Sequence, residues 1–247
     1  MSHLMSSAAV NSKVQNAAMM SDLRDKSLII FDWDGTLMDS IGLIVKSMHI
    51  AGEANGFYTT DEAVKSIIGL NLIRGIQILY PQATPEQHLA IQQSYADYYV
   101  QASIAPNQPH SQFFEGIEGM LQQLKRQHKQ LAVATGKKRA GLDRVMDYSQ
   151  SRHYFVTSRC ADESGSKPEP QMLIDILQET NYKVSEAVFI GDSIHDIQMA
   201  KQLDMTSIAV SYGAASREAL AAQNPTYHVD TPAQLIELLT TDELSFR

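Results

Sequence analysis

Short apolar runs recur along the chain, and polar residues follow most of them. The runs from Leu28 to Phe31, Leu131 to Ala134 and Ala187 to Ile190 each contain four apolar residues. Runs of this length, apolar throughout, are typical of strands buried on both faces of a parallel sheet. Ser207 to Val210 and a stretch around Tyr154 to Thr157 are interpreted as further short strands.

Helical periodicity separates these predicted strands. Apolar residues recur every three or four positions from Ile117 to Leu124, from Leu142 to Met146 and from Leu173 to Leu177. Strands that alternate with helices indicate right-handed βαβ units. We therefore expect an α/β fold, with a Rossmann-like parallel sheet and helices on both faces.

Residues 40–105 carry helical signals only. Asp39 and Ser40 offer N-cap side chains, and the run TPEQ from Thr84 combines an N-cap, a proline in the first turn and a capping-box glutamine. Prolines at positions 106 and 109 indicate a linker. These signals predict an all-helical cap domain at 40–105, inserted into an α/β core formed by 27–39 and 106–247.

Composition narrows the class of protein. Hydrophobic residues fill 44% of 247 positions, enough for a sizeable core. The net charge of −8 argues against nucleic acid and anionic membranes as partners, although a local basic pocket could hold a phosphate. No stretch approaches the roughly 20 apolar residues that span a bilayer. The chain has one cysteine and no secretory pattern, so we expect a cytoplasmic protein with a disordered tail at 1–26.

Two carboxylates follow the first predicted strand. Asp32 comes directly after Phe31, and Asp34 points to the same side because side chains alternate along an extended chain. Gly35 and Thr36 then favour a sharp turn. Two like charges held together are costly unless a cation joins them or one acid is protonated. The pair therefore indicates a metal-assisted nucleophile with an acid/base partner rather than a solvated loop.

Other polar residues occupy comparable places. Thr135 follows the second apolar run, Asp192 follows the third, and Lys167 precedes the first of two prolines that lead into a helix. Ligands of open α/β sheets bind beyond the carboxyl ends of the strands. We therefore expect Asp32, Thr135, Lys167 and Asp192 to meet in space.

Taken together, these motifs resemble the haloacid dehalogenase-type phosphohydrolase superfamily. The matching pieces, in the family's order, are Asp32-Trp33-Asp34-Gly35-Thr36, Thr135 at a strand end, Lys167 before Pro168, and Gly191-Asp192 with Asp196 four residues later. The small helical insert resembles that of the phosphoglycolate phosphatase-like branch. The resemblance implies a Mg²⁺-dependent phosphatase that hydrolyses small phosphate monoesters through an aspartyl-phosphate, with a small phosphorylated metabolite as its partner.

The resemblance also implies a role for each residue. Asp32 would attack phosphorus, and Asp34 would protonate the leaving alcohol. Mg²⁺ would be held by Asp32, Asp192 and the main-chain carbonyl of Asp34, since a hard cation prefers oxygen ligands. Lys167 and Thr135 would stabilise the phosphoryl oxygens.

Further residues are candidates for supporting contacts. Gly136 and Lys137 stand at a helix start beside the site, where Lys137 could reach the substrate, although a solvated charge run is the alternative. Asp196 either interacts with the start of its helix or supports the metal. Asn71 and Arg74 lie in the insert, where similar enzymes place selectivity contacts.

Two other functions stay open at this point. A phosphosugar mutase of the β-phosphoglucomutase type would share the core and differ chiefly in the cap. A non-catalytic phosphate-binding module is disfavoured by the intact pair of Asp32 and Asp34. Dehalogenases are disfavoured because their pattern lacks the second acid. The sequence decides neither the physiological ester nor the oligomeric state.

Overall fold

The computed structural model describes residues 22–104 and 112–240. Within these ranges, six strands form one parallel sheet in the order β5-β4-β1-β6-β7-β8. The predicted α/β class with a Rossmann-like parallel sheet is confirmed. The strands are β1 (Leu28–Phe31), β4 (Gln130–Thr135), β5 (Thr157–Cys160), β6 (Ala187–Gly191), β7 (Thr206–Val210) and β8 (Tyr227–Val229).

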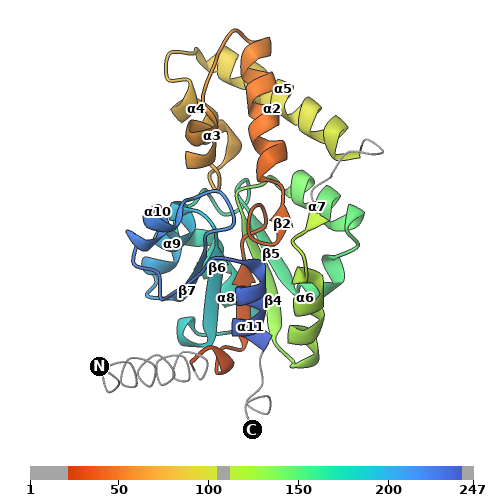
Figure 1. The fold of residues 1–247 in the computed structure, drawn as a ribbon, viewed down its shortest axis with the longest axis vertical. Coiled ribbons are helices and arrows are strands. Elements are labelled where there is room, and N and C mark those ends of the chain that lie inside the picture. Colours follow the sequence, from red (N-terminus) through yellow and green to blue (C-terminus); the bar gives the residue numbers. More distant parts are fainter. Residues whose placement is uncertain (1–21, 105–111, 241–247) are drawn as a thin grey trace, which may run out of the picture.

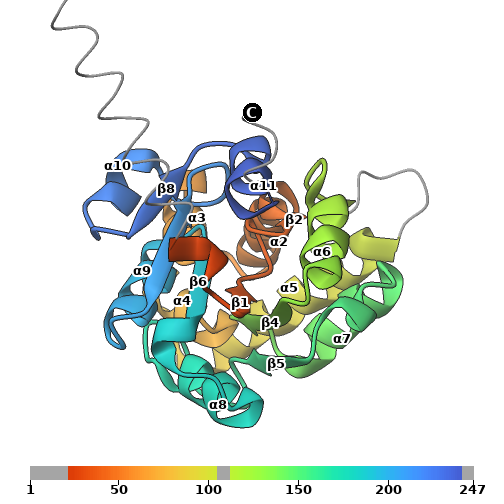
Figure 2. The same cartoon turned by 90° about the horizontal axis from the view of Figure 1, so that it is seen from below.

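Helices cover both faces of the sheet, which explains why its central strands are apolar throughout. Side chains alternate along β1, so Ile29 and Phe31 pack into one hydrophobic cluster while Leu28 and Ile30 pack into the other. Figure 2 shows α6 and α11 on one side of the strands and α8 on the other. The helices of the first cluster are α6 (Ile117–Arg126), α7 (Arg139–Tyr148) and α11 (Pro232–Thr240), and those of the second are α8 (Gln171–Thr180) and α9 (Ile194–Lys201).

In the described part of the chain between residues 39 and 112, four helices stand over the carboxyl end of the sheet (Figure 1). They enclose a separate hydrophobic cluster that includes Met48, Ile76 and Ile91. The start and the end of this segment lie side by side, because β2 (Met38–Asp39) pairs with β3 (Gln112–Phe113) in antiparallel fashion. We call this segment the helical insert. It consists of α2 (Ile41–Ala54), α3 (Asp61–Ser66), α4 (Leu72–Leu79) and α5 (Pro85–Ile104).

The remaining elements are short. A helix, α10 (Arg217–Ala221), lies beside α9, and two 3₁₀ turns, η1 (Arg152–Tyr154) and η2 (Val184–Glu186), precede β5 and β6. In the described ranges, no helix has both the length and the apolar character needed to cross a membrane. The domain boundary predicted at residue 105 falls outside the described residues and stays a prediction.

Two local expectations differ from the structure. The sequence predicts a disordered tail that includes residues 22–26, yet Leu23 is buried in the core and Lys26 Nζ lies 3.2 Å from Asp22 Oδ1. The rest of that tail, 1–21, lies outside the described residues. Strand β5 begins at Thr157 rather than near Tyr154, because the ring of Tyr154 is buried in the core from a 3₁₀ turn. The apolar residues around Tyr154 are therefore explained by packing into the core, not by an extended backbone.

Candidate active site

Polar residues end three neighbouring strands at one edge of the sheet. Asp32 follows β1, Thr135 is the last residue of β4, and Asp192 follows β6. Because β1 lies between β4 and β6 and all three run parallel, these side chains emerge beside one another. Each of the three is buried. The structure therefore brings together residues from three distant parts of the sequence, as expected.

A buried lysine joins two of the acids at this edge. Lys167 Nζ lies 2.8 Å from Asp32 Oδ1 and 2.7 Å from Asp196 Oδ1, and the lysine side chain is 0% exposed. Burial alone would lower the pKa of Lys167, but the carboxylates of Asp196 and Asp32 raise it above its ordinary value. Lys167 therefore stays charged in the interior.

Asp192 is held in place by two donors. The hydroxyl of Thr36 donates to Oδ1 over 3.1 Å, and the main-chain N–H of Ala214 donates to Oδ2 over 2.7 Å. The turn after Asp34 makes room for this carboxylate, because Gly35 has a φ of +75° and any Cβ there would collide with Asp192 Oδ2. The predicted sharp turn thus allows the Asp192 carboxylate to lie close to the backbone at Gly35.

Asp196 closes the first turn of α9. Its Oδ2 accepts hydrogen bonds from the main-chain N–H and the hydroxyl of Ser193, over 3.0 and 2.7 Å, and its Oδ1 accepts from Lys167. Both oxygens are therefore engaged by this chain. The sequence left open whether Asp196 interacts with the start of its helix or supports the metal. The structure shows the first interaction, a capping box with Ser193.

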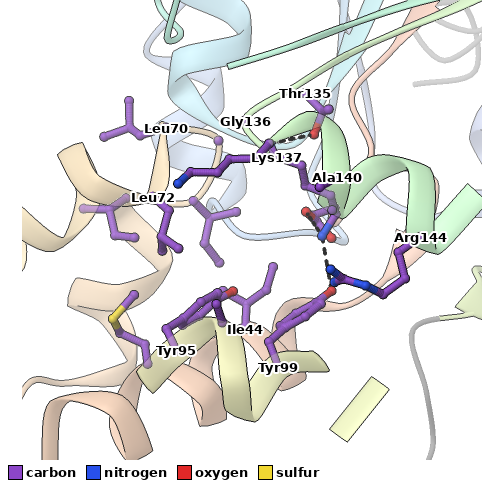
Figure 3. Close-up of a pocket in the computed structure, with 18 of the residues that line it drawn as sticks. Ile44, Leu70, Leu72, Tyr95, Tyr99, Thr135, Gly136, Lys137, Ala140 and Arg144 are labelled. Carbon is purple, nitrogen blue, oxygen red and sulfur yellow. Dashed lines mark hydrogen bonds and ion pairs between the residues drawn. The ribbon is translucent and has the colours of Figure 1, made fainter. Parts of the chain in front are cut away.

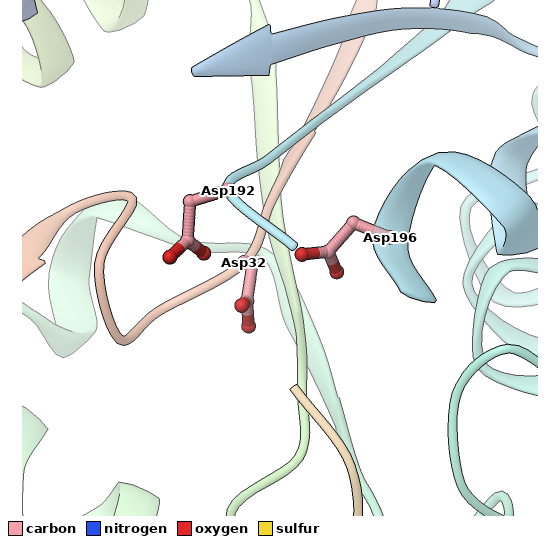
Figure 4. Close-up of side chains that lie close together, drawn as sticks. All are labelled: Asp32, Asp192 and Asp196. Atoms are coloured by element: carbon pink, nitrogen blue, oxygen red, sulfur yellow. The ribbon is translucent and has the colours of Figure 1, made fainter. Parts of the chain in front are cut away.

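The buried acids carry more charge than the lysine neutralises. Oxygens of Asp32, Asp192 and Asp196 lie within 4.8 Å of one another (Figure 4). With all three carboxylates ionised, one ammonium would leave two net negative charges in this buried site. Burial raises the pKa of Asp32 to about 7 and, together with the charge of Asp32, raises that of Asp192 well above its ordinary value.

These groups fit a divalent cation. Asp32 Oδ1 is buried, and the Lys167 ammonium 2.8 Å away is its one close cationic partner among the described residues. The repulsion among three buried carboxylates that share one ammonium is relieved when a dication that prefers oxygen ligands binds between them. The carboxylates present thus match a metal centre better than they match a metal-free interior.

Asp34 lies on the other side of the turn and is only partly buried. The hydroxyl of Ser40 donates to Asp34 Oδ1 over 2.6 Å, and Lys137 Nζ lies 2.9 Å from Asp34 Oδ2. The expectation that Asp39 and Ser40 cap α2 through their side chains is wrong. Asp39 belongs to β2, and Ser40 makes no side-chain cap hydrogen bond: its ψ of −6° lies outside the extended region typical of N-cap residues, and its hydroxyl donates to the Asp34 carboxylate.

Lys137 and Gly136 lie at one of the contacts between the core and the helical insert. Lys137 Nζ also donates to the hydroxyl of Tyr99 on α5, over 3.2 Å. A Cβ at Gly136 would lie 2.6 Å from the carbonyl oxygen of Gly69 and 2.7 Å from that of Leu70. Two predicted candidates therefore stand where the insert closes over the acids.

A cavity of about 240 Å³ separates the acids from the insert. Asp32, Asp34 and Thr135 line it from the core, and Tyr95 and Tyr99 line it from α5 (Figure 3). A phosphate ester in this cavity would reach Asp32 and Asp34 together.

The comparisons with known proteins agree with this geometry. Residues 29–210 match the family described as haloacid dehalogenase-like hydrolase. The chain belongs to this family. "Probable phosphatase IndB" of Dickeya dadantii (strain 3937) is 31% identical over 85% of this chain and 92% of that protein. The phosphoglycolate phosphatase of Vibrio parahaemolyticus is 26% identical over 87% of this chain and 97% of that protein.

A solved structure from Bacteroides vulgatus, which bears the name of a β-phosphoglucomutase, has a TM-score of 0.74 to this chain. It is 20% identical and covers 92% of this chain and 100% of that one, so it shows the fold alone. The family match and the phosphatase relatives confirm the prediction of an enzyme of the phosphatase type within the phosphoglycolate phosphatase-like branch.

Two predicted selectivity residues of this hydrolase lie outside the cavity. The Asn71 side chain accepts from the main-chain N–H of Ile73, over 3.1 Å, and so caps α4. The main-chain N–H of Asn71 donates to the hydroxyl of Ser166 on the core, over 2.9 Å. Arg74 is exposed, and neither residue lines the cavity. Their proposed contact with substrate stays a prediction that this arrangement does not support.

Sequence reasoning missed several residues of the hydrolase site. Ser40 orients Asp34 from six residues away, and Thr36 orients Asp192 from 156 residues away, yet a hydroxyl after an acidic turn carries no sequence signal for either partner. Tyr95 and Tyr99 had a usable signal, because residues four apart share a face of a helix. Both tyrosines line the cavity, so this shared face was the signal for the inner surface of the insert.

The contact at Gly136 gives a testable expectation. Gly136→Ala forces a methyl group against two carbonyl oxygens of the insert, so the free energy of unfolding should fall by about 1–3 kcal/mol. Gly119→Ala is the matched control, because a Cβ in that turn of α6 meets no atom within 4 Å and should stabilise the helix by about 0.5–1 kcal/mol. Urea unfolding measures both variants. Equal stabilities would contradict the close approach of insert and core.

Proposed function

We propose that this hydrolase is a Mg²⁺-dependent phosphatase that cleaves small phosphate monoesters through an aspartyl-phosphate on Asp32. The observation that carries the proposal is the buried acid cluster. In it Asp32 contacts Lys167, and three carboxylates share this single ammonium, which favours binding of a dication. The phosphatase relatives and the cavity beside Asp32 and Asp34 support it.

Asp32, Asp192 and the main-chain carbonyl of Asp34 would hold the metal. We leave Asp196 out of this set, because Lys167 and Ser193 already engage both of its oxygens. When bound, Mg²⁺ supplies positive charge that offsets the acids and the phosphoryl oxygens. Asp196 then acts as a positioning residue, since it fixes Lys167 against Asp32.

In the first step, an oxygen of Asp32 forms a bond to phosphorus while the bond between phosphorus and the ester oxygen breaks. A proton from Asp34 passes to the departing oxygen and gives a neutral alcohol. Ser40 and Lys137 hold the Asp34 carboxyl in the cavity for this transfer. Thr135 Oγ1 accepts from the main-chain N–H of Lys137, over 3.3 Å, so its own O–H is free to donate to a phosphoryl oxygen.

In the second step, water attacks phosphorus and gives its proton to Asp34. The bond between phosphorus and Asp32 breaks, which releases inorganic phosphate and restores both acids. Lys167 stays charged throughout and stabilises the phosphoryl oxygens from its buried position. The insert limits the access of other water to the intermediate.

A phosphosugar mutase is the second candidate, because a structure named for that activity shares the fold. A mutase returns the phosphoryl group to the sugar, whereas a phosphatase transfers it to water. Incubation with a hexose phosphate separates the two by their products, an isomeric sugar phosphate or inorganic phosphate. Turnover of p-nitrophenyl phosphate separates both from a non-catalytic binding module.

Metal binding should be visible without activity. At a Mg²⁺ concentration about 100 times Kd, binding stabilises the native state by about 2.7 kcal/mol, which should raise Tm by about 5–10 °C. Asp192→Asn should lose this shift, because the amide removes a ligand charge yet can still accept from Ala214 and donate to Thr36. Asp97→Asn, an exposed acid on α5, is the control that should keep it. Equal shifts in all three proteins would refute the site.

The acid role of Asp34 predicts a dependence on the leaving group. Asp34→Asn should lower kcat/KM for alkyl phosphates by about a hundredfold to ten-thousandfold, because an alkoxide needs a proton to depart. The loss for p-nitrophenyl phosphate should be below about tenfold, since p-nitrophenolate departs unprotonated. Steady-state kinetics on both esters measure the difference, and kcat/KM isolates the first step. An equal loss on both would show that Asp34 is not the acid.

A further inference from the structure

The wall that the helical insert presents to the acids is apolar. Each lining residue from the insert is aliphatic, aromatic or glycine, and none carries a charge. Ile44 comes from α2, Leu72 from α4, and Tyr95 and Tyr99 from α5 (Figure 3). This wall faces the position where the alcohol part of a phosphate ester must lie when its phosphorus meets Asp32.

The cationic side chains of the cavity all come from the core. Lys137 is already paired with Asp34, at 2.9 Å, and with the hydroxyl of Tyr99. Lys138 and Arg144 also line the cavity, but both are exposed and therefore stand at its solvent side. Among the described residues that line the cavity, Lys137 is the one cation that is not exposed, and a carboxylate on the alcohol would have to compete for it with Asp34 and Tyr99. A buried, unpaired carboxylate would be costly there.

Two aromatic rings give the wall a flat and fixed surface. Tyr95 and Tyr99 lie one helical turn apart, with ring centroids 5.7 Å apart and ring planes only 21° from parallel. The hydrogen bond from Lys137 to the Tyr99 hydroxyl fixes the orientation of that ring. Flat aromatic surfaces pack well against rings and hydrocarbon chains.

The volume of the cavity indicates how large a group it can bury. An apolar cavity of about 150 Å³ is large enough to bind benzene. The cavity here measures about 240 Å³ and must also admit the phosphoryl group. The space beside that group therefore suits one aromatic ring or a chain of about six carbons.

We propose that the substrate is the phosphate monoester of an apolar alcohol, with an aromatic ring or a hydrocarbon chain of about six carbons, rather than phosphoglycolate. This inference rests on the proposed phosphatase activity and narrows its substrate class. The core residues bind the phosphoryl group of any ester alike, while the insert selects the alcohol through burial of its apolar surface.

A matched series of esters tests the inference. With Mg²⁺ present, kcat/KM should rise about two- to fourfold per methylene from ethyl through butyl to hexyl phosphate, as each buried methylene strengthens binding. Hexyl and phenyl phosphate should exceed phosphoglycolate by at least about tenfold. A flat alkyl series, or phosphoglycolate as the best ester, would overturn the inference and leave the phosphatase proposal intact. Absence of turnover for every ester, p-nitrophenyl phosphate included, would overturn both.

A variant locates the effect in the cavity. Ala140 lies on α7, lines the cavity and is exposed, so Ala140→Leu should fold normally while it takes up cavity space. The ratio of kcat/KM for hexyl phosphate to that for ethyl phosphate should fall at least about fivefold in this variant. Ala221→Leu, at an exposed position of α10 outside the cavity, is the control and should keep the wild-type ratio. An unchanged ratio in Ala140→Leu would contradict the assignment.

Discussion

The buried contact of Lys167 with Asp32 and Asp196 is the interaction on which the site depends. An ammonium taken out of water costs several kcal/mol unless carboxylates compensate it. Here the lysine, 0% exposed, joins the acid after β1 to the acid in the first turn of α9. Hydrogen bonds from Thr36 and from the main-chain N–H of Ala214 hold Asp192 beside these two acids. The excess of two negative charges then creates the need for a dication.

A second set of contacts connects this buried centre to the helical insert. Asp34 lies between Ser40, at the start of the insert, and Lys137, at the start of α7. Lys137 in turn binds Tyr99 of α5. The group proposed to donate the proton is thus held by the elements that meet when the insert covers the site. Phosphoryl chemistry belongs to the core, and the choice of alcohol belongs to the apolar wall above it.

The parts of this arrangement that follow from local rules could be predicted from the sequence. Buried parallel strands require apolar runs, and neighbouring strands bring Asp32 and Asp192 to one edge whatever their separation in the chain. Choices between competing partners could not be predicted. Ser40 could have capped α2 but donates to Asp34, Asn71 caps α4 instead of facing the cavity, and Tyr154 is buried from a turn instead of a strand. Each outcome depends on distances that exist only in the folded chain.

The central claim is that Asp32 is the nucleophile beside a metal held by Asp32 and Asp192. A crystal structure of the protein with Mg²⁺ and beryllofluoride tests it most directly, because beryllofluoride mimics a phosphoryl group bonded to a carboxylate. We expect beryllium bonded to an oxygen of Asp32, with Mg²⁺ in contact with Asp32 and Asp192. An adduct on Asp34, or a magnesium ion bound away from Asp192 with Asp32 unmodified, would contradict the account.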